Sequence, residues 1–142
     1  MKKVYPKWSE LPNLDLYLDQ VLLYVNQLDS SSIVDDDKGL TSAMINNYVK
    51  NGHLDKPIKK KYNRKQLARL IVITCLKNVF SIQEISKTIN SLTLDGSSEE
   101  MYDNFVMCMN GEKRDGLADV IVAACDTVRL YKKTHDLVEK LK

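Results

Sequence analysis

The chain has 142 residues, 44% of them hydrophobic and 28% charged, and a formal net charge of +2 at pH 7. This length and composition are typical of one soluble domain, or one domain with an extension, around a sizeable core. With only five glycines and three prolines, few tight turns are expected, so we predict an all-α protein. The longest strongly apolar run, LIVIT, is too short to span a bilayer, and no signal-peptide core follows the N-terminal lysines. We therefore expect a cytoplasmic protein that does not contact a membrane.

The N-terminal 39 residues are predicted to hold one helix between two irregular segments. Residues 1–13 are an extended lead-in, and Trp8 is expected to pin it to the body of the protein. A helix is predicted over residues 15–28, with an apolar stripe at spacings of three and four. The stripe consists of Leu14, Leu18, Val21, Val25 and Leu28. Residues 29–39 are a loop whose three acids, Asp35, Asp36 and Asp37, are consecutive and not alternating as in a calcium loop, so no metal is expected there.

Residues 40–92 contain three predicted helices whose caps can be read directly. Thr41 caps a short helix that ends at Gly52, and in this helix Met44, Ile45 and Tyr48 share one apolar side. Asn63 caps an apolar helix that runs from residue 64 to about residue 78. Ser81 opens the third helix, with Glu84 three residues later completing a capping box. Between the first two, residues 55–62 are expected to form a short hairpin.

Positive charge is concentrated in the middle of this stretch. Residues 50–69 hold eight basic side chains and one acid, Asp55, whereas the segments before and after are each slightly acidic. A nearly neutral protein with one basic window of this kind is expected to turn that surface toward a polyanion.

The same stretch resembles the DNA-binding half of the MerR family of bacterial regulators. Residues match that family's recognition helix, its exit, its wing, the helix after the wing and its final block. They are Ile45, Tyr48, Gly52, Leu54, Pro57, Tyr62, Leu67, Leu70, Ile73, Phe80, Ser81, Ile82, Glu84 and Ile85. Along nearly its whole length, including WSELPNLDLYLDQV and MINNYVKNG, the chain also resembles the bacterial domain-of-unknown-function family 1836. The first resemblance implies a winged helix-turn-helix that binds DNA, and the second implies no biochemistry.

The chain departs from the MerR pattern at positions that matter for DNA. Asn46 stands where that family has arginine, Asn47 where it has an aromatic residue or histidine, and Val49 where it has glutamate. The wing from residue 54 to residue 62 is about five residues shorter than the family's and lacks its Asn-Gly turn. The fold is therefore expected to carry over better than the individual contacts.

We predict that double-stranded DNA contacts the short helix and the basic wing. Asparagine can bond the edge of adenine, and lysine can reach guanine or phosphate. The predicted DNA-binding residues are Ser42, Asn46, Asn47, Lys50, Lys59, Lys60, Lys61, Arg64 and Lys65, with Arg69 also expected near the phosphates. The predicted function is DNA-binding transcriptional regulation. The alternative is a non-enzymatic helical module for protein–protein interaction that keeps the fold without binding DNA.

The C-terminal part, residues 93–142, is predicted to hold a short helix over 98–110, capped by Ser98, and a last helix over 113–141. Apolar residues in the last helix follow a heptad. They are Leu117, Ile121, Ala124, Val128, Tyr131, His135 and Val138. Either this helix packs over the first helix, or it pairs with its mate in a homodimer. We expect its N-terminal half to be buried in the protomer and Val128, Tyr131, His135 and Val138 to serve dimerisation.

Catalysis is not expected. The two histidines, His53 and His135, lie near no nucleophile motif, and there is no glycine-rich phosphate loop.

The cysteines, Cys75, Cys108 and Cys125, lack metal or redox spacing and are expected to be buried free thiols. Three aromatics, Tyr102, Phe105 and Tyr131, are candidates to line an effector pocket, although core packing is the expectation. No cofactor is implied. The predicted division of the chain is 1–39, 40–92 and 93–142.

Overall fold

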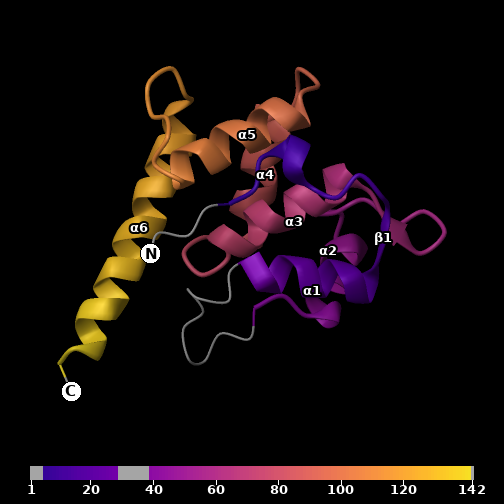
Figure 1. Ribbon diagram of the computed structural model, residues 1–142, viewed down its shortest axis with the longest axis horizontal. Coiled ribbons are helices and arrows are strands. Elements are labelled where there is room, and N and C mark those ends of the chain that lie inside the picture. Colours follow the sequence, from indigo (N-terminus) through magenta and orange to yellow (C-terminus); the bar gives the residue numbers. More distant parts are fainter. Residues whose placement is uncertain (1–4, 29–38, 142) are drawn as a thin grey trace.

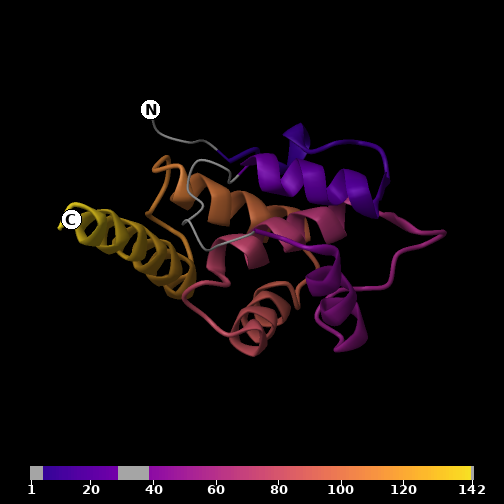
Figure 2. The same cartoon turned by 90° about the horizontal axis from the view of Figure 1, so that it is seen from below.

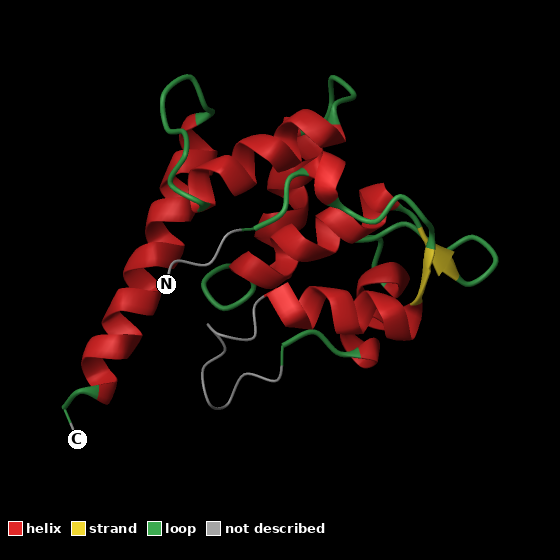
Figure 3. Ribbon diagram, viewed as in Figure 1, coloured by secondary structure: helices red, strands yellow, loops and turns green. Residues whose placement is uncertain are grey.

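The computed structural model describes residues 5–28 and 39–141, and within them the chain is predominantly α-helical (Figure 3). The all-α class is confirmed. In chain order the elements are a 3₁₀ turn, η1, a strand and a helix, then a second helix and strand, and then four helices. They are η1 (Trp8–Glu10), β1 (Leu16–Tyr17), α1 (Leu18–Leu28), α2 (Ser42–Lys50), β2 (Lys61–Tyr62), α3 (Arg64–Leu76), α4 (Ile82–Leu92), α5 (Ser98–Met109) and α6 (Asp119–Glu139).

Helix α3 is the centre of the fold. Nine of its residues are buried, on all sides of the helix, and it contacts α1, α4, α5 and α6. A helix that is apolar all round must be covered on every side to be stable in water. A single cluster of buried side chains reaches from Tyr5 to Val128, so the three predicted segments share one core.

The predicted caps between residues 41 and 84 are confirmed. Thr41 Oγ1 accepts from the backbone N–H of Met44. Asn63 forms a capping box with Gln66, and Ser81 forms one with Glu84. Each cap satisfies backbone N–H groups that an isolated helix end leaves unpaired.

The N-terminal lead-in is fastened to α5 across almost the whole chain, as the prediction for Trp8 anticipated. The backbone of Tyr5 exchanges two hydrogen bonds with the Asn110 side chain, at 2.7 and 3.0 Å. Trp8 donates its backbone N–H to Asp103, and its ring meets that of Tyr102 edge to face, with centroids 6.2 Å apart. Tyr102 Oη donates to Pro6 O at 2.7 Å, and burial raises the pKa of this phenol.

Three predicted boundaries are wrong. Residues 15–17 are not helical, because Leu16 and Tyr17 pair with Tyr62 and Lys61 in an antiparallel ladder, and Leu14 is 77% exposed. The cap of α5 is Ser97 and not Ser98. The last helix begins at Asp119 and not at residue 113, because the chain turns at Gly116 with a φ of +79°. The local sequence pattern predicted helix in segments that the fold uses for strand pairing or for a turn.

Helix α6 packs on α5 and α3, rather than over the first helix as one reading had it. Its C-terminal half continues beyond the other helices, at the opposite end of the molecule from β1 and β2 (Figure 1).

Candidate nucleic-acid interface

Helix α2 presents one polar face to solvent. Ile45 is fully buried on the inner side, with Met44 and Tyr48 half-buried beside it. The exposed side carries all four of the residues predicted on this helix, Ser42, Asn46, Asn47 and Lys50. Asn47 Oδ1 lies 3.4 Å from Asn51 Nδ2, a weak hydrogen bond within the exposed row. The helix can therefore offer amide and ammonium groups to a partner without giving up core contacts.

Residues 58–61 form a two-residue hairpin whose tip consists of two lysines. The backbones of Ile58 and Lys61 exchange hydrogen bonds of 3.0 Å in both directions. Lys59 and Lys60 both have positive φ, +51° and +68°. Positive φ at both loop positions is the geometry of type I′ turns, in which Asn-Gly is preferred because other L residues are strained. Two exposed cations are thus held at the tip at a cost in backbone energy.

The hairpin was predicted at the correct position, but the pairing of its second strand was not predicted. Within the tip, Ile58 and Lys61 form an isolated bridge. Strand β2 pairs with β1, which lies about 45 residues earlier in the sequence. The hairpin is consequently anchored to the N-terminal part of the fold and projects from the body at the same end as α2 (Figure 2).

Some predicted cations are engaged elsewhere in the protein. Lys61 Nζ lies 5.1 Å from the centroid of the Tyr17 ring, a cation–π contact. Arg64 Nη2 donates to Asn13 Oδ1 at 2.9 Å. Lys65 is exposed but lies on the wall of a cavity between α3, α4 and α5. Lys50, Lys59 and Lys60 are exposed with no such contact among the described residues.

Arg69, which was expected near the phosphates, is bonded within the protein. Its Nε donates to His53 O at 2.6 Å and its Nη2 to Ser86 Oγ at 2.9 Å, so the guanidinium is turned into the protein. Burial lowers the pKa of Arg69, and the nearby Asp55 carboxylate partly opposes this shift. The side chain fixes the loop after α2 against α3 and α4.

Gln66 has the same role one turn earlier and was missed by the sequence reasoning. Its Nε2 donates to the carbonyl oxygens of Asp55 and Lys56, each at 2.9 Å, while its Oε1 accepts from Asn63 N. The signal in the sequence is its place three residues after the asparagine cap Asn63, where a glutamine can complete a capping box. Together, Gln66 and Arg69 hold the segment that joins α2 to the hairpin.

The predicted dimerisation residues separate into two groups. Val128 is 2% exposed and packs in the core of the chain, so its side chain is not available to a partner. Tyr131 and Val138 are 37% and 52% exposed, and His135 is half-buried. On the same half of α6, Leu130 and Leu137 are also exposed, and so is Leu141, two residues beyond the end of the helix.

The other candidate sites give little chemistry. Tyr102 and Phe105 are buried core residues. Cys108 and Cys125 are buried free thiols and Cys75 is half-buried. Within residues 5–28 and 39–141, no group of three or more histidine, cysteine or acidic side chains is placed to hold a metal ion, and the acidic run at 35–37 lies outside these ranges. No helix in the described part of the chain is long and apolar enough to cross a membrane.

Residues 6–105 match the family described as a domain of unknown function (DUF1836). The chain belongs to this family. The match covers η1, β1, α1 to α4, β2 and most of α5, so it includes both α2 and the lysine hairpin and leaves α6 outside. No curated protein and no solved structure matches the chain.

Proposed function

We propose that the protein binds double-stranded DNA and regulates transcription through a MerR-like winged helix-turn-helix. The observation that supports this best is the pair formed by α2 and the lysine hairpin. A helix with an exposed row of asparagines suits the edges of bases in the major groove. Cations at the tip of a neighbouring hairpin suit phosphates, which supply affinity but no sequence choice.

The way these two elements are held favours the same function. A DNA reader must keep its helix and its phosphate contacts in fixed register. Here Gln66 and Arg69 fasten the connecting backbone at three points, with bonds of 2.6 to 2.9 Å. Lys59, Lys60 and Lys50 are the cations we assign to phosphates or guanine first. Lys61, Arg64 and Lys65 have competing contacts, so their share is smaller.

We further propose that the regulator is a cytoplasmic homodimer paired through the exposed half of α6. Tyr131, His135 and Val138 follow one another at spacings of four and three, as in a coiled-coil seam. The exposed leucines at 130, 137 and 141 widen the apolar surface. Dimeric readers of this kind bind two half-sites related by the symmetry of the protein. The same surface also supports the alternative function, a protein–protein interaction module.

The test is a titration of a labelled duplex containing the protein's own upstream region, at several salt concentrations and with random duplex as competitor. We expect saturable binding that survives competitor, with log affinity falling linearly as log salt rises. Folded protein that leaves the duplex free even at low salt would overturn the proposal. It would then be the apolar half of α6 that needed a partner.

Substitution of Asn47 by alanine should change sequence preference more than total affinity. A bidentate amide contact to adenine discriminates bases by about 1–3 kcal/mol, whereas phosphate contacts do not discriminate. Selection of bound sequences from a random pool, done for both proteins, measures this. Loss of affinity for all sequences alike would instead assign Asn47 to the backbone.

A further inference from the structure

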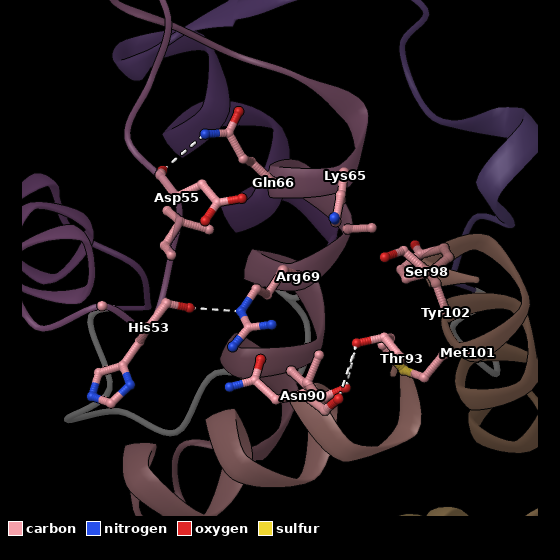
Figure 4. A pocket seen from close by; sticks show the side chains of 14 residues that line it. His53, Asp55, Lys65, Gln66, Arg69, Asn90, Thr93, Ser98, Met101 and Tyr102 are labelled. Atoms are coloured by element: carbon pink, nitrogen blue, oxygen red, sulfur yellow. Dashed lines mark hydrogen bonds between the residues drawn. The ribbon is translucent and has the colours of Figure 1, made fainter. Parts of the chain in front are cut away.

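The cavity behind the α2–hairpin connection is lined by side chains from four parts of the chain. It has a volume of about 190 Å³. The connection contributes His53 and Asp55, α3 contributes Lys65 and Arg69, and the remaining wall comes from the end of α4 and the start of α5 (Figure 4). We propose that this cavity binds a small anion bearing a carboxylate or a phosphate group.

Donors converge on the cavity from two sides. The Lys65 ammonium points into it from above in Figure 4, and the guanidinium of Arg69 reaches it from the side of the connection. Arg69 is already fixed by its bonds to His53 O and Ser86 Oγ. A fixed guanidinium loses little entropy on binding an anion, and burial strengthens its field.

The opposite wall adds a third donor group. Ser98 is the first residue of α5, a helix of 12 residues, and its hydroxyl faces Lys65 across the cavity. The dipole at a helix start favours negative charge, and here it is partly offset by Glu99 and Glu100 in the first turn of α5. Here that end adds to two side-chain cations and does not act alone.

The charged side chains that line the cavity have a net positive charge, which favours an anion. Asp55 is the acid among the lining residues and offsets one of the two cations. At the end of α4, the Thr93 hydroxyl donates to Ile89 O at 2.8 Å. This carbonyl oxygen therefore already has a hydrogen-bond donor within the protein. The Lys65, Arg69 and Asp55 side chains together sum to a single positive charge.

The cavity is large enough for a small anion. Its volume of about 190 Å³ accommodates inorganic phosphate or a short dicarboxylate such as malonate. An occupant would touch both the segment that carries α2 into the hairpin and the first turn of α5.

The experiment is calorimetric titration of the folded full chain with inorganic phosphate and with malonate, against chloride at equal ionic strength. We expect saturable 1:1 binding of at least one of them. Replacing Lys65 by methionine, which keeps most of the stem and removes the charge, should weaken binding by about tenfold, as for loss of a charge-assisted hydrogen bond. Replacing Asp55 by asparagine should tighten it. Lys113→Met, in the exposed turn before α6, is the matched control and should have no effect.

These variants separate a built site from diffuse attraction. Lys65 and Asp55 are both exposed, so the folded state should survive each change, and circular dichroism checks this. Phosphate binding without malonate binding would assign the site to phosphate groups, and the reverse to carboxylates. The proposal fails if neither anion saturates at 1:1, or if Lys113→Met weakens binding as much as Lys65→Met does. Neither result depends on whether the protein binds DNA.

Discussion

Replacing Lys59 and Lys60 by glutamate should lower the affinity for double-stranded DNA by about a hundredfold and leave the fold intact. Each lysine lost removes one phosphate contact and its released counterion, and each glutamate adds repulsion. Both side chains are exposed at the hairpin tip, so no buried contact is lost. The slope of log affinity against log salt should also decrease, by about two. The measurement is the salt titration of the labelled duplex.

The matched control reverses two lysines at the other end of the molecule. Lys113→Glu with Lys140→Glu changes the net charge by the same amount, outside α2 and the hairpin. It should weaken DNA binding far less, because long-range attraction between exposed charges is screened within about 8–10 Å at physiological salt. Equal losses in the two double variants would mean that only net charge matters. Undiminished affinity after reversal at the hairpin would favour the protein-interaction alternative.

The structure also decides which pair of lysines to reverse. From the sequence alone, Lys60 and Lys61 are the natural choice, since they end the basic run. In the fold, Lys61 lies in β2 and over the Tyr17 ring, so its substitution disturbs the ladder that anchors the hairpin. Lys59 and Lys60 occupy the tip itself. The sharper experiment thus follows from strand pairing, which residue type and charge did not reveal.

What the sequence predicted correctly was mostly local. Thr41, Asn63 and Ser81 were identified as caps because a cap depends on a side chain and a backbone N–H three residues later. The inner face of α2 was likewise identified from helical spacing. Such features depend on residues within one helical turn, and the tertiary contacts of this fold are compatible with them.

The errors concern contacts between distant segments. The pairing of β1 with β2 joins residues about 45 positions apart, and it turned the predicted first turn of a helix into a strand. Arg69 was grouped with surface cations, since charge alone does not show that Ser86 and the His53 carbonyl lie within its reach. The cavity at Lys65 was missed for the same reason, because its four walls come from separate segments.

Exchanging the hairpin tip for Asn-Gly should stabilise the protein and weaken its binding to DNA. A non-glycine residue at positive φ costs roughly 1–2 kcal/mol, and asparagine and glycine tolerate this region best. Allowing for the greater entropy of glycine in the unfolded chain, Lys59→Asn with Lys60→Gly should raise the free energy of unfolding by about 1 kcal/mol. This corresponds to an increase in Tm of about 3 °C. DNA affinity should fall together with the salt slope, because both tip charges are gone.

The variant Lys59→Ala with Lys60→Ala separates charge from strain. It removes the same two cations but leaves two L residues at positive φ, so it should lose DNA affinity to a similar extent without gaining stability. Thermal unfolding and the DNA titration, done on both double variants, give four measurements. Suppose that Asn-Gly raises Tm and that both variants lose DNA affinity to the same extent. The two lysines are then kept at the tip for binding, at a cost in stability that an unstrained Asn-Gly turn would avoid. If Asn-Gly binds DNA as tightly as the natural chain, the lysines have no part in binding and the strained turn requires another explanation.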